Sequence, residues 1–432
     1  MAFLVSPGVQ VNEIDLTNVV PAVATSIGAI AGAFEKGPVS SIVNITSEEE
    51  LVKIFGKPQA SSNQFETFFT ASQFLQYTNS LKVVRAESAI LNAGANSGIL
   101  IRDDDHYQAS FAAGEGSHGE WAARTAGTHG NSIGVEICAA STAYEQVVSA
   151  LTVSEDAAGA TSIAVDDADA SGEAFNVGDL ISFFSDSGAT TPVDEFNEYE
   201  VTAINTSTNV LTVRLKDDPN GAGLQNIVPD NSYIKRRWKF YDLFDGAPGT
   251  TQWSTDNARG SGDELHIVVY DTTGDITGKV ATAAGGRTSG VIETFGNMSK
   301  NPSAKTAQGG SNYYPDVIFT QSTFIYWTDH ISAGSNWGTD TTSAYTSVVP
   351  ITIDALTGGT DDYALTAGEY ELAYDKFADT ESIDVNLVLG GRGGGAADTA
   401  SSMDTHGTMI TSLVETRRDC VGFVSPYRAA TV

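Results

Sequence analysis

Hydrophobic and polar positions switch between strand-like and helix-like spacing near the start of the chain. Residues 26–34 form an apolar run that Gly and Pro then stop, which is typical of a buried strand. Residues 47–58 predict a short helix, because a capping box opens the segment and Gly and Pro close it. Apolar residues on one face predict a second helix over 63–77, and residues 81–86 read as a short strand. Strand, helix, helix, strand is typical of an α/β arrangement.

A different pattern occupies residues 149–235, where short β runs alternate with clusters of Gly, Asp, Ser and Asn. Their spacing is typical of a small barrel or sandwich. The tract holds 15 acidic and three basic residues, a net charge of −12. After it the α/β pattern returns, with predicted strands at 264–270, 383–389 and 420–424 and predicted helices at 363–380 and 397–417. We therefore predict a multidomain α+β or α/β fold with an inserted, acidic all-β domain.

The order of these patterns predicts three parts. Residues 1–20 form an extended N-terminal arm, residues 21–148 and 236–432 form a discontinuous α/β core, and residues 149–235 form the insert. Within the arm, apolar and polar residues alternate over 9–12. A terminal segment has few neighbours against which to bury such a face. It is either the first strand of the chain's own sheet or a strand that adds to another sheet edge, and the residues alone leave both readings open.

Charge then excludes several kinds of partner. The 432 residues include 54 acidic and 23 basic ones, which gives a net charge of −31. A protein binds nucleic acids or anionic membranes through a positively charged surface, so neither is an expected partner. A hydrophobic share of 41% is too high for a disordered acidic chain. No apolar run is long enough to span a membrane and the N-terminus lacks a basic region, so we expect a soluble protein made without a signal peptide.

Candidate chemistry is sparse. Cys138 and Cys420 each lie in an apolar run, which predicts two buried free thiols from a reducing compartment. The sequence G-x-G-x-x-A at 391–396 matches a dinucleotide fingerprint, but no acidic residue follows the next strand to hold a ribose, so a plain loop is preferred. The acid runs at 103–105 and 167–172 are read as solvated turns, not ion sites. We predict no catalytic residues, no cofactor and no metal ligands.

Several sequence blocks nevertheless occur in an order that resembles the tail sheath proteins of contractile-tailed, myovirus-type bacteriophages. The blocks are LVSPGV (4–9), GAIAGAFEKGP (28–38), ELVKIFGKP (50–58), FLQY (74–77), LKVVRA (81–86), GTHGNSI (127–133), LTGGTD (356–361) and FADTESIDV (377–385). The acidic β tract lies between them as a variable insertion. No block is diagnostic alone, whereas the ordered set is specific.

The resemblance implies a structural subunit and not an enzyme. In that family, subunits polymerise as stacked hexameric rings around a tail tube, and contraction drives the tube through the host envelope for genome ejection. Implied partners are further copies of the chain, the tail tube protein, and baseplate and tail terminator proteins, in a virion assembled in the host cytoplasm. Terminal arms in the family add strands to neighbouring sheets, so Val9, Val11 and Ile14 are expected to contact a neighbouring subunit.

The sequence is also consistent with three alternative interpretations. A tailocin-like bacterial contractile injection system would use a similar sheath subunit, a nucleotide-binding α/β enzyme would use the 391–396 loop, and an adhesion protein would use the β insert. Sheath proteins continue beyond the point that matches Ser425 and Pro426. The chain is therefore expected to lack the family's C-terminal region and to fold without forming sheaths by itself. The acidity of residues 149–235 predicts that the insert projects outward from the sheath.

Overall fold

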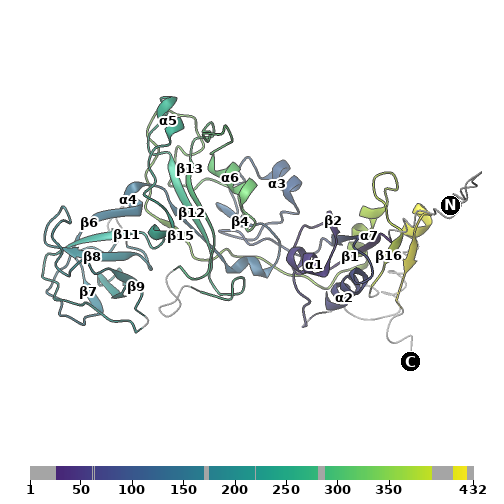
Figure 1. Cartoon of the computed structure of the whole chain (residues 1–432), viewed down its shortest axis with the longest axis horizontal. Helices are drawn as coiled ribbons and strands as arrows, with labels where there is room; N and C mark the ends of the chain where they lie inside the picture. The colour runs from purple at the N-terminus through teal and green to yellow at the C-terminus, as the bar shows by residue number, and fades with distance from the viewer. Residues whose placement is uncertain are drawn as a thin grey trace, which may run out of the picture.

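The computed structural model describes residues 26–169, 175–280, 288–391 and 412–425, apart from positions 61, 63 and 219. These residues form several sheets and short helices, so the predicted mixed α/β character is confirmed. The larger sheets follow one another along the longest axis of the molecule (Figure 1), with a four-stranded sheet between a five-stranded and a six-stranded one. Within the described part of the chain, none of the helices has the length and apolarity needed to cross a bilayer.

The five-stranded sheet, called the first sheet below, joins segments from opposite ends of the described chain. Its strand order is β17-β16-β1-β3-β2. All neighbouring strands are parallel except β2, which runs antiparallel to β3. The strands are β1 (Gly28–Gly32), β2 (Ile42–Ile45), β3 (Leu81–Arg85), β16 (Leu387–Leu389) and β17 (Val421–Phe423).

Helices cover both faces of the first sheet. α1 (Glu48–Phe55) and α2 (Gln64–Leu75) share a core cluster with Ile30 on one face. α7 (Ala367–Tyr374) shares another cluster with Ala31 on the opposite face. Successive side chains of a strand point to opposite faces, which explains why the unbroken apolar run of β1 serves both layers.

The start of α1 differs in part from the predicted capping box. The Ser47 hydroxyl accepts a hydrogen bond from Glu50 N at 3.2 Å, as the box requires. The Glu50 carboxylate, however, accepts from the main-chain N and the hydroxyl of Thr46, at 2.8 and 2.7 Å. Thr46 offers two donors where the Ser47 N–H would offer one. The complete box forms at the start of α7 instead, between Thr366 and Glu369.

Predictions near the C-terminus need correction. The helix predicted over 363–380 is the shorter α7, followed by the 3₁₀ turn η4 (Asp375–Phe377), because its N-cap lies at Thr366. The strand predicted over 383–389 narrows to β16, since the Ile383 carbonyl accepts from the Arg417 guanidinium at 2.8 Å. Of the helix predicted over 397–417, residues 412–417 are helical and the others lie outside the described residues.

The four-stranded antiparallel sheet in the middle of the molecule has the order β13-β12-β5-β15. Its strands are β5 (Ile133–Cys138), β12 (Glu264–Asp271), β13 (Val291–Ser299) and β15 (Ile351–Ile353). Packed around it are β4 (Trp121–Ala123), α6 (Tyr314–Gln321), β14 (Ile325–Trp327), α3 (Asp104–Ser110), η2 (Thr128–Ser132), α4 (Ser141–Tyr144), η3 (Tyr241–Leu243) and α5 (Gln252–Asp256). The strand predicted at 264–270 is confirmed as β12.

The acidic tract contributes a six-stranded antiparallel sheet of order β6-β11-β8-β9-β10-β7. Its strands are β6 (Glu145–Leu151), β7 (Ser162–Ala164), β8 (Leu180–Phe184), β9 (Tyr199–Asn205), β10 (Val210–Leu215) and β11 (Tyr233–Arg237). The two edge strands approach each other: Val153 N donates to Ala164 O at 3.1 Å, and Asp166 N donates to Leu151 O at 3.0 Å. The sheet therefore curls round its own apolar cluster.

Two smaller predictions also change. Both cysteines are free, but Cys138 is buried whereas Cys420 is only half-buried. The 103–105 acid run opens α3 and is not a solvated turn. Asp103 caps that helix by accepting from His106 N at 2.8 Å, and Asp104 forms an ion pair with a neighbouring arginine.

Candidate assembly surface

Exposed apolar side chains concentrate on the first sheet and the segments packed on it. Ten large hydrophobic residues are exposed among those described, and six of them belong to this layer. The six are Phe69, Tyr77, Leu372, Val421, Phe423 and Val424. The other four lie on the acidic tract, and the described residues around the middle sheet contribute none. These residues lie on both faces and at one edge of the sheet, because α2 and α7 cover opposite faces. Exposed apolar side chains that gather on one unit favour contacts of that unit with other proteins.

The strand β17 forms an open edge of the first sheet. On its inner side Val421 N donates to Asn386 O at 2.8 Å, and Phe423 O accepts from Gly390 N at 2.7 Å. On its outer side no other described strand pairs with it. Val421 and Phe423 are 57% and 52% exposed. Unpaired main-chain groups beside apolar side chains form a template for strand addition.

Arg417 fixes the position of this edge. Its buried guanidinium donates to the carbonyl groups of Phe377 and Ile383, the latter at 2.8 Å, and pairs with Asp419 at 3.0 Å. These bonds tie the turn before β17 to the segment that follows α7. The edge is therefore preorganised, which reduces the entropy lost when a strand docks on it.

The predicted arm residues Val9, Val11 and Ile14 lie outside the described residues. The described chain enters the first sheet through β1, which already pairs with β3 on one side and β16 on the other. An added strand cannot pair with such an interior strand. The edge strands of the described sheet are β17 and β2. The edge at β17 carries exposed apolar side chains, and its position follows only from the order of strands that are far apart in the sequence.

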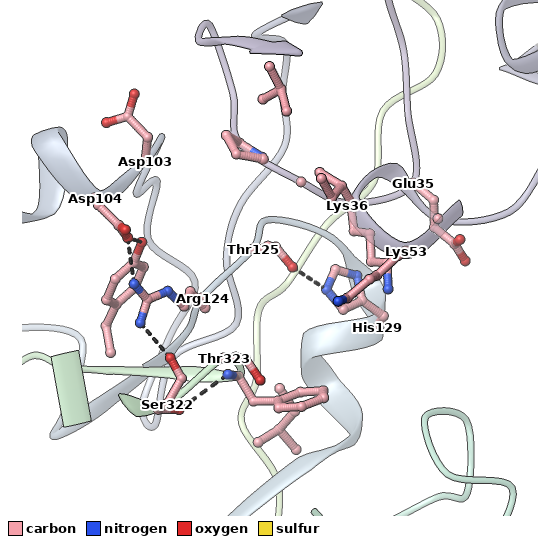
Figure 2. Close-up of a pocket in the computed structure, with 18 of the residues that line it drawn as sticks. Glu35, Lys36, Lys53, Asp103, Asp104, Arg124, Thr125, His129, Ser322 and Thr323 are labelled. Carbon is pink, nitrogen blue, oxygen red and sulfur yellow. Dashed lines mark hydrogen bonds and ion pairs between the residues drawn. The ribbon is translucent and has the colours of Figure 1, made fainter. Parts of the chain in front are cut away.

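A cleft of about 1130 Å³ lies between the first sheet and the middle sheet. Figure 2 shows Lys36 and Lys53 beside His129 on one wall and Asp104 beside Arg124 on the other. Arg124 Nη2 lies 2.8 Å from the Asp104 carboxylate, which fixes both charges. The cleft is therefore lined by charges of both signs, and its electrostatic potential does not favour a ligand of one charge throughout.

Behind the cleft, the buried Arg85 links the two sheets. Its guanidinium donates to Gly37 O at 3.1 Å, on the side of the first sheet, and to Ala126 O at 2.8 Å, on the side of the middle sheet. Burial lowers the pKa of Arg85 to about 10, so the group stays charged at neutral pH. Asp361 supports this charge and also accepts from Thr128 N at 3.0 Å. Directional bonds thus set the angle between the two sheets.

His129 faces the same junction. Its Nε2 lies 2.6 Å from the Thr125 hydroxyl. Burial, helped by the nearby Arg85 charge, lowers the pKa of His129 to about 4, so the imidazole is neutral at pH 7. The described ranges hold no group of three or more side chains that could bind a metal ion. Arg85 and His129 thus lie at the junction between the first sheet and the middle sheet.

The remaining predicted motifs fall largely outside the described residues. Of the 391–396 loop only Gly391 is described, with a positive φ of 58°. Of the 167–172 acid run, residues 167–169 are described, and there Asp169 N donates to the Asp167 carboxylate at 3.2 Å. That bond is a local turn contact.

Comparison with known proteins connects these features to a family. The profile described as "Tail sheath protein Gp18 domain III N-terminal region" matches residues 25–86, the segment that forms β1, β2, α1, α2 and β3. The tail sheath protein of Enterobacteria phage T4 is 26% identical over 449 residues, an alignment that includes 99% of this chain. The chain is related to bacteriophage tail sheath proteins.

Further tail sheath relatives match smaller parts or with lower identity. The tail sheath protein of Vibrio phage KVP40 is 40% identical over 114 residues, which cover 23% of this chain and 17% of that protein. The chain spans 63% of the length of the T4 tail sheath protein. The solved sheath tail protein from Listeria innocua matches with 11% identity and a TM-score of 0.35, over 92% of this chain and 47% of its own.

The tail sheath resemblance did not itself identify the exposed residues of the first sheet. β17 was predicted only as a strand, and α2 only as a helix. One signal was available: residues 64–80 hold a single charged residue, Glu66, in a chain in which 18% of residues are charged. An exposed helix with so few charges indicates a contact surface.

Proposed function

We propose that the chain is the structural subunit of a contractile phage tail sheath. It polymerises as stacked hexameric rings around a tail tube and contracts to drive the tube through the host envelope for genome ejection. The observation that carries this proposal is the relationship to the T4 tail sheath protein, which extends over 99% of the chain. The concentration of exposed apolar residues on one sheet supports a subunit that assembles through that sheet.

The proposed partners are further copies of the chain, the tail tube protein, and baseplate and tail terminator proteins. The proposed location is the virion, after assembly in the host cytoplasm. Neither nucleic acid nor a membrane is a direct partner in this proposal, because a net charge of −31 repels both.

The proposed subunit has three parts: the arm (1–20), the core (21–148 with 236–432) and the insert (149–235). The insert points outward, because its net charge of −12 keeps neighbouring tails apart in solution. Its six-stranded sheet lies at the opposite end of the molecule from the first sheet (Figure 1), which supports a separate location in the assembly.

The arm of one subunit docks on the first sheet of the next in this proposal. Val9, Val11 and Ile14 lie in the segment that adds as a strand to the open edge of β17. The main-chain groups of Val421 and Phe423 form hydrogen bonds with the β16 side of the sheet. Gly422, between them, therefore presents its N–H and C=O outward. Those outward groups are the ones that a neighbour's arm would bond.

Immunogold electron microscopy tests the function directly. Antibodies raised against the purified chain are applied to the virus that encodes it. Label should follow the full length of the extended tail and the shortened cylinder after contraction. Label confined to the head, to fibres or to the baseplate would contradict the proposal.

A peptide experiment tests arm docking separately. A synthetic peptide of residues 4–17 is titrated into the purified chain. Gly422→Pro removes the outward N–H and leaves the bonds to β16 in place, so it should abolish peptide binding, whereas the matched Gly422→Ala variant should retain it. Equal binding by both variants would show that the arm does not use this edge.

A further inference from the structure

The outward side of α2 combines aromatic and amide side chains without charge. Phe69 is 47% exposed and Tyr77, just beyond the last helical residue, is 89% exposed. Gln73 and Gln76 are exposed between them. Phe69 and Gln73 lie four residues apart on α2, which places them on the same side of the helix. Gln76 and Tyr77 follow directly after its last residue, Leu75. We call this set of four side chains the α2 face.

The α2 face is not needed to complete the core. Phe68 and Ala71 fill the inward side and are 2% and 0% exposed. Phe69 makes an edge contact with Phe68 of this core, at 5.7 Å between ring centres, and is itself about half exposed. Aromatic enrichment with charge depletion is the composition of the buried centre of a protein–protein interface.

Charge indicates which molecule covers this face. Residues 25–86 contain five acidic and five basic residues and carry no net charge, whereas the whole chain carries −31. Two copies of so acidic a chain repel each other over most of their surfaces, and a contact between them is least costly where the charges balance. A basic partner would gain more electrostatic attraction from the acidic tract than from this neutral segment, so a basic partner is not favoured here.

We propose that the α2 face is a contact surface for a second copy of this chain. The inference rests on the proposed function and adds a second contact to the strand edge. The two contacts are compatible in one subunit, because α2 packs on a face of the first sheet and β17 forms an edge of it. Arm docking uses main-chain groups, whereas this contact uses aromatic side chains and amides.

Sedimentation velocity of the purified chain, without any tube protein, tests the proposal. The test variant is Tyr77→Glu, whose side chain is so exposed in the monomer that folding should be unaffected. The matched control is Phe196→Glu, because Phe196 is an aromatic residue of the acidic tract with 68% exposure. The wild type and Phe196→Glu should associate with rising concentration. Tyr77→Glu should associate about 30-fold more weakly, as expected for an aromatic residue at the centre of an interface.

Each other outcome rejects the inference. If Tyr77→Glu associates like the wild type, the α2 face does not join copies. If Tyr77→Glu self-associates like the wild type but no longer binds tail tubes in a separate pull-down, the face binds the tube protein and not a second copy. If the wild type stays monomeric at every concentration, the self-contact is absent, while immunogold labelling of tails still decides the proposed function. A second variant, Gln73→Glu with Gln76→Glu, repeats the test without altering an aromatic residue.

Discussion

Removing the Lys239 ammonium should destabilise the middle sheet far more than removing a surface charge. Glu136 lies on β5 and is completely buried, and Lys239 Nζ lies 2.5 Å from its carboxylate. The indole N–H of Trp238 donates to the other carboxylate oxygen. In Lys239→Met the carboxylate loses its only neighbouring ammonium among the described contacts while it stays buried.

The expected cost is about 3–5 kcal/mol, the range for breaking a buried ion pair by removing one partner. The cost should depend on pH. Burial raises the pKa of Glu136 above 4.5, and Lys239 opposes that rise, so the variant's pKa is higher still. Folded Glu136 then binds a proton at pH values where the unfolded chain has released it. The stability of the variant therefore falls as pH rises from about 4.5 through the folded pKa, and the loss at pH 8 exceeds the loss at pH 5.

Hydrogen exchange of peptides from β5 and β12 measures this loss locally, which matters because a chain with several units does not unfold in one step. After correction for intrinsic exchange, the amides should open at least about 100-fold more often in Lys239→Met at pH 8. The control is Lys235→Met, which removes a half-exposed pair with Glu145 and should cost less than about 1 kcal/mol. Equal effects of the two variants, or a loss without pH dependence, would refute the reasoning.

Three further outcomes are expected. Arg417→Met should speed hydrogen exchange in β17 about 100-fold, because a buried guanidinium holds the turn before that strand, whereas the exposed Arg418→Met should change it little. Burial acts to raise the pKa of Asp271, but main-chain donors led by Thr277 hold it below 3.8; wild-type thermal stability should therefore fall as pH drops below that value, and Asp271→Asn should show a flatter profile. Self-association through the α2 face should strengthen when NaCl rises from about 0.05 to about 0.5 M, because salt screens the repulsion between acidic copies; weakening in the same sedimentation experiment would indicate an ion-paired contact instead.

Local signals in the sequence predicted the elements whose ends are set by neighbouring residues. α1 begins at a serine whose hydroxyl bonds the helix and ends at Gly56, whose φ of 83° suits a glycine. α2, β3 and β12 also form where apolar spacing predicted them. These elements were predictable because their determinants lie within a few residues of one another.

Distant contacts explain what the sequence did not predict. The predicted 383–389 strand is shortened because the guanidinium of Arg417, more than thirty residues away, donates a hydrogen bond to the Ile383 carbonyl. The open edge of β17 depends on pairing between β1 and β16, which joins opposite ends of the described chain. Local sequence patterns therefore could not predict the assembly surface, although the small number of charged residues in α2 indicated a contact there.

Buried charges lie at both junctions between the three larger sheets. Arg85 bridges the first sheet and the middle sheet, and Glu136 with Lys239 fixes the segment that leads from the six-stranded sheet to the middle one. A buried charge keeps its stabilisation only in the geometry that supplies its partners. The chain is thus built to keep one orientation of its parts. In the proposed sheath this property lets a subunit move as a rigid body, so that contraction changes the contacts between copies and leaves each copy folded.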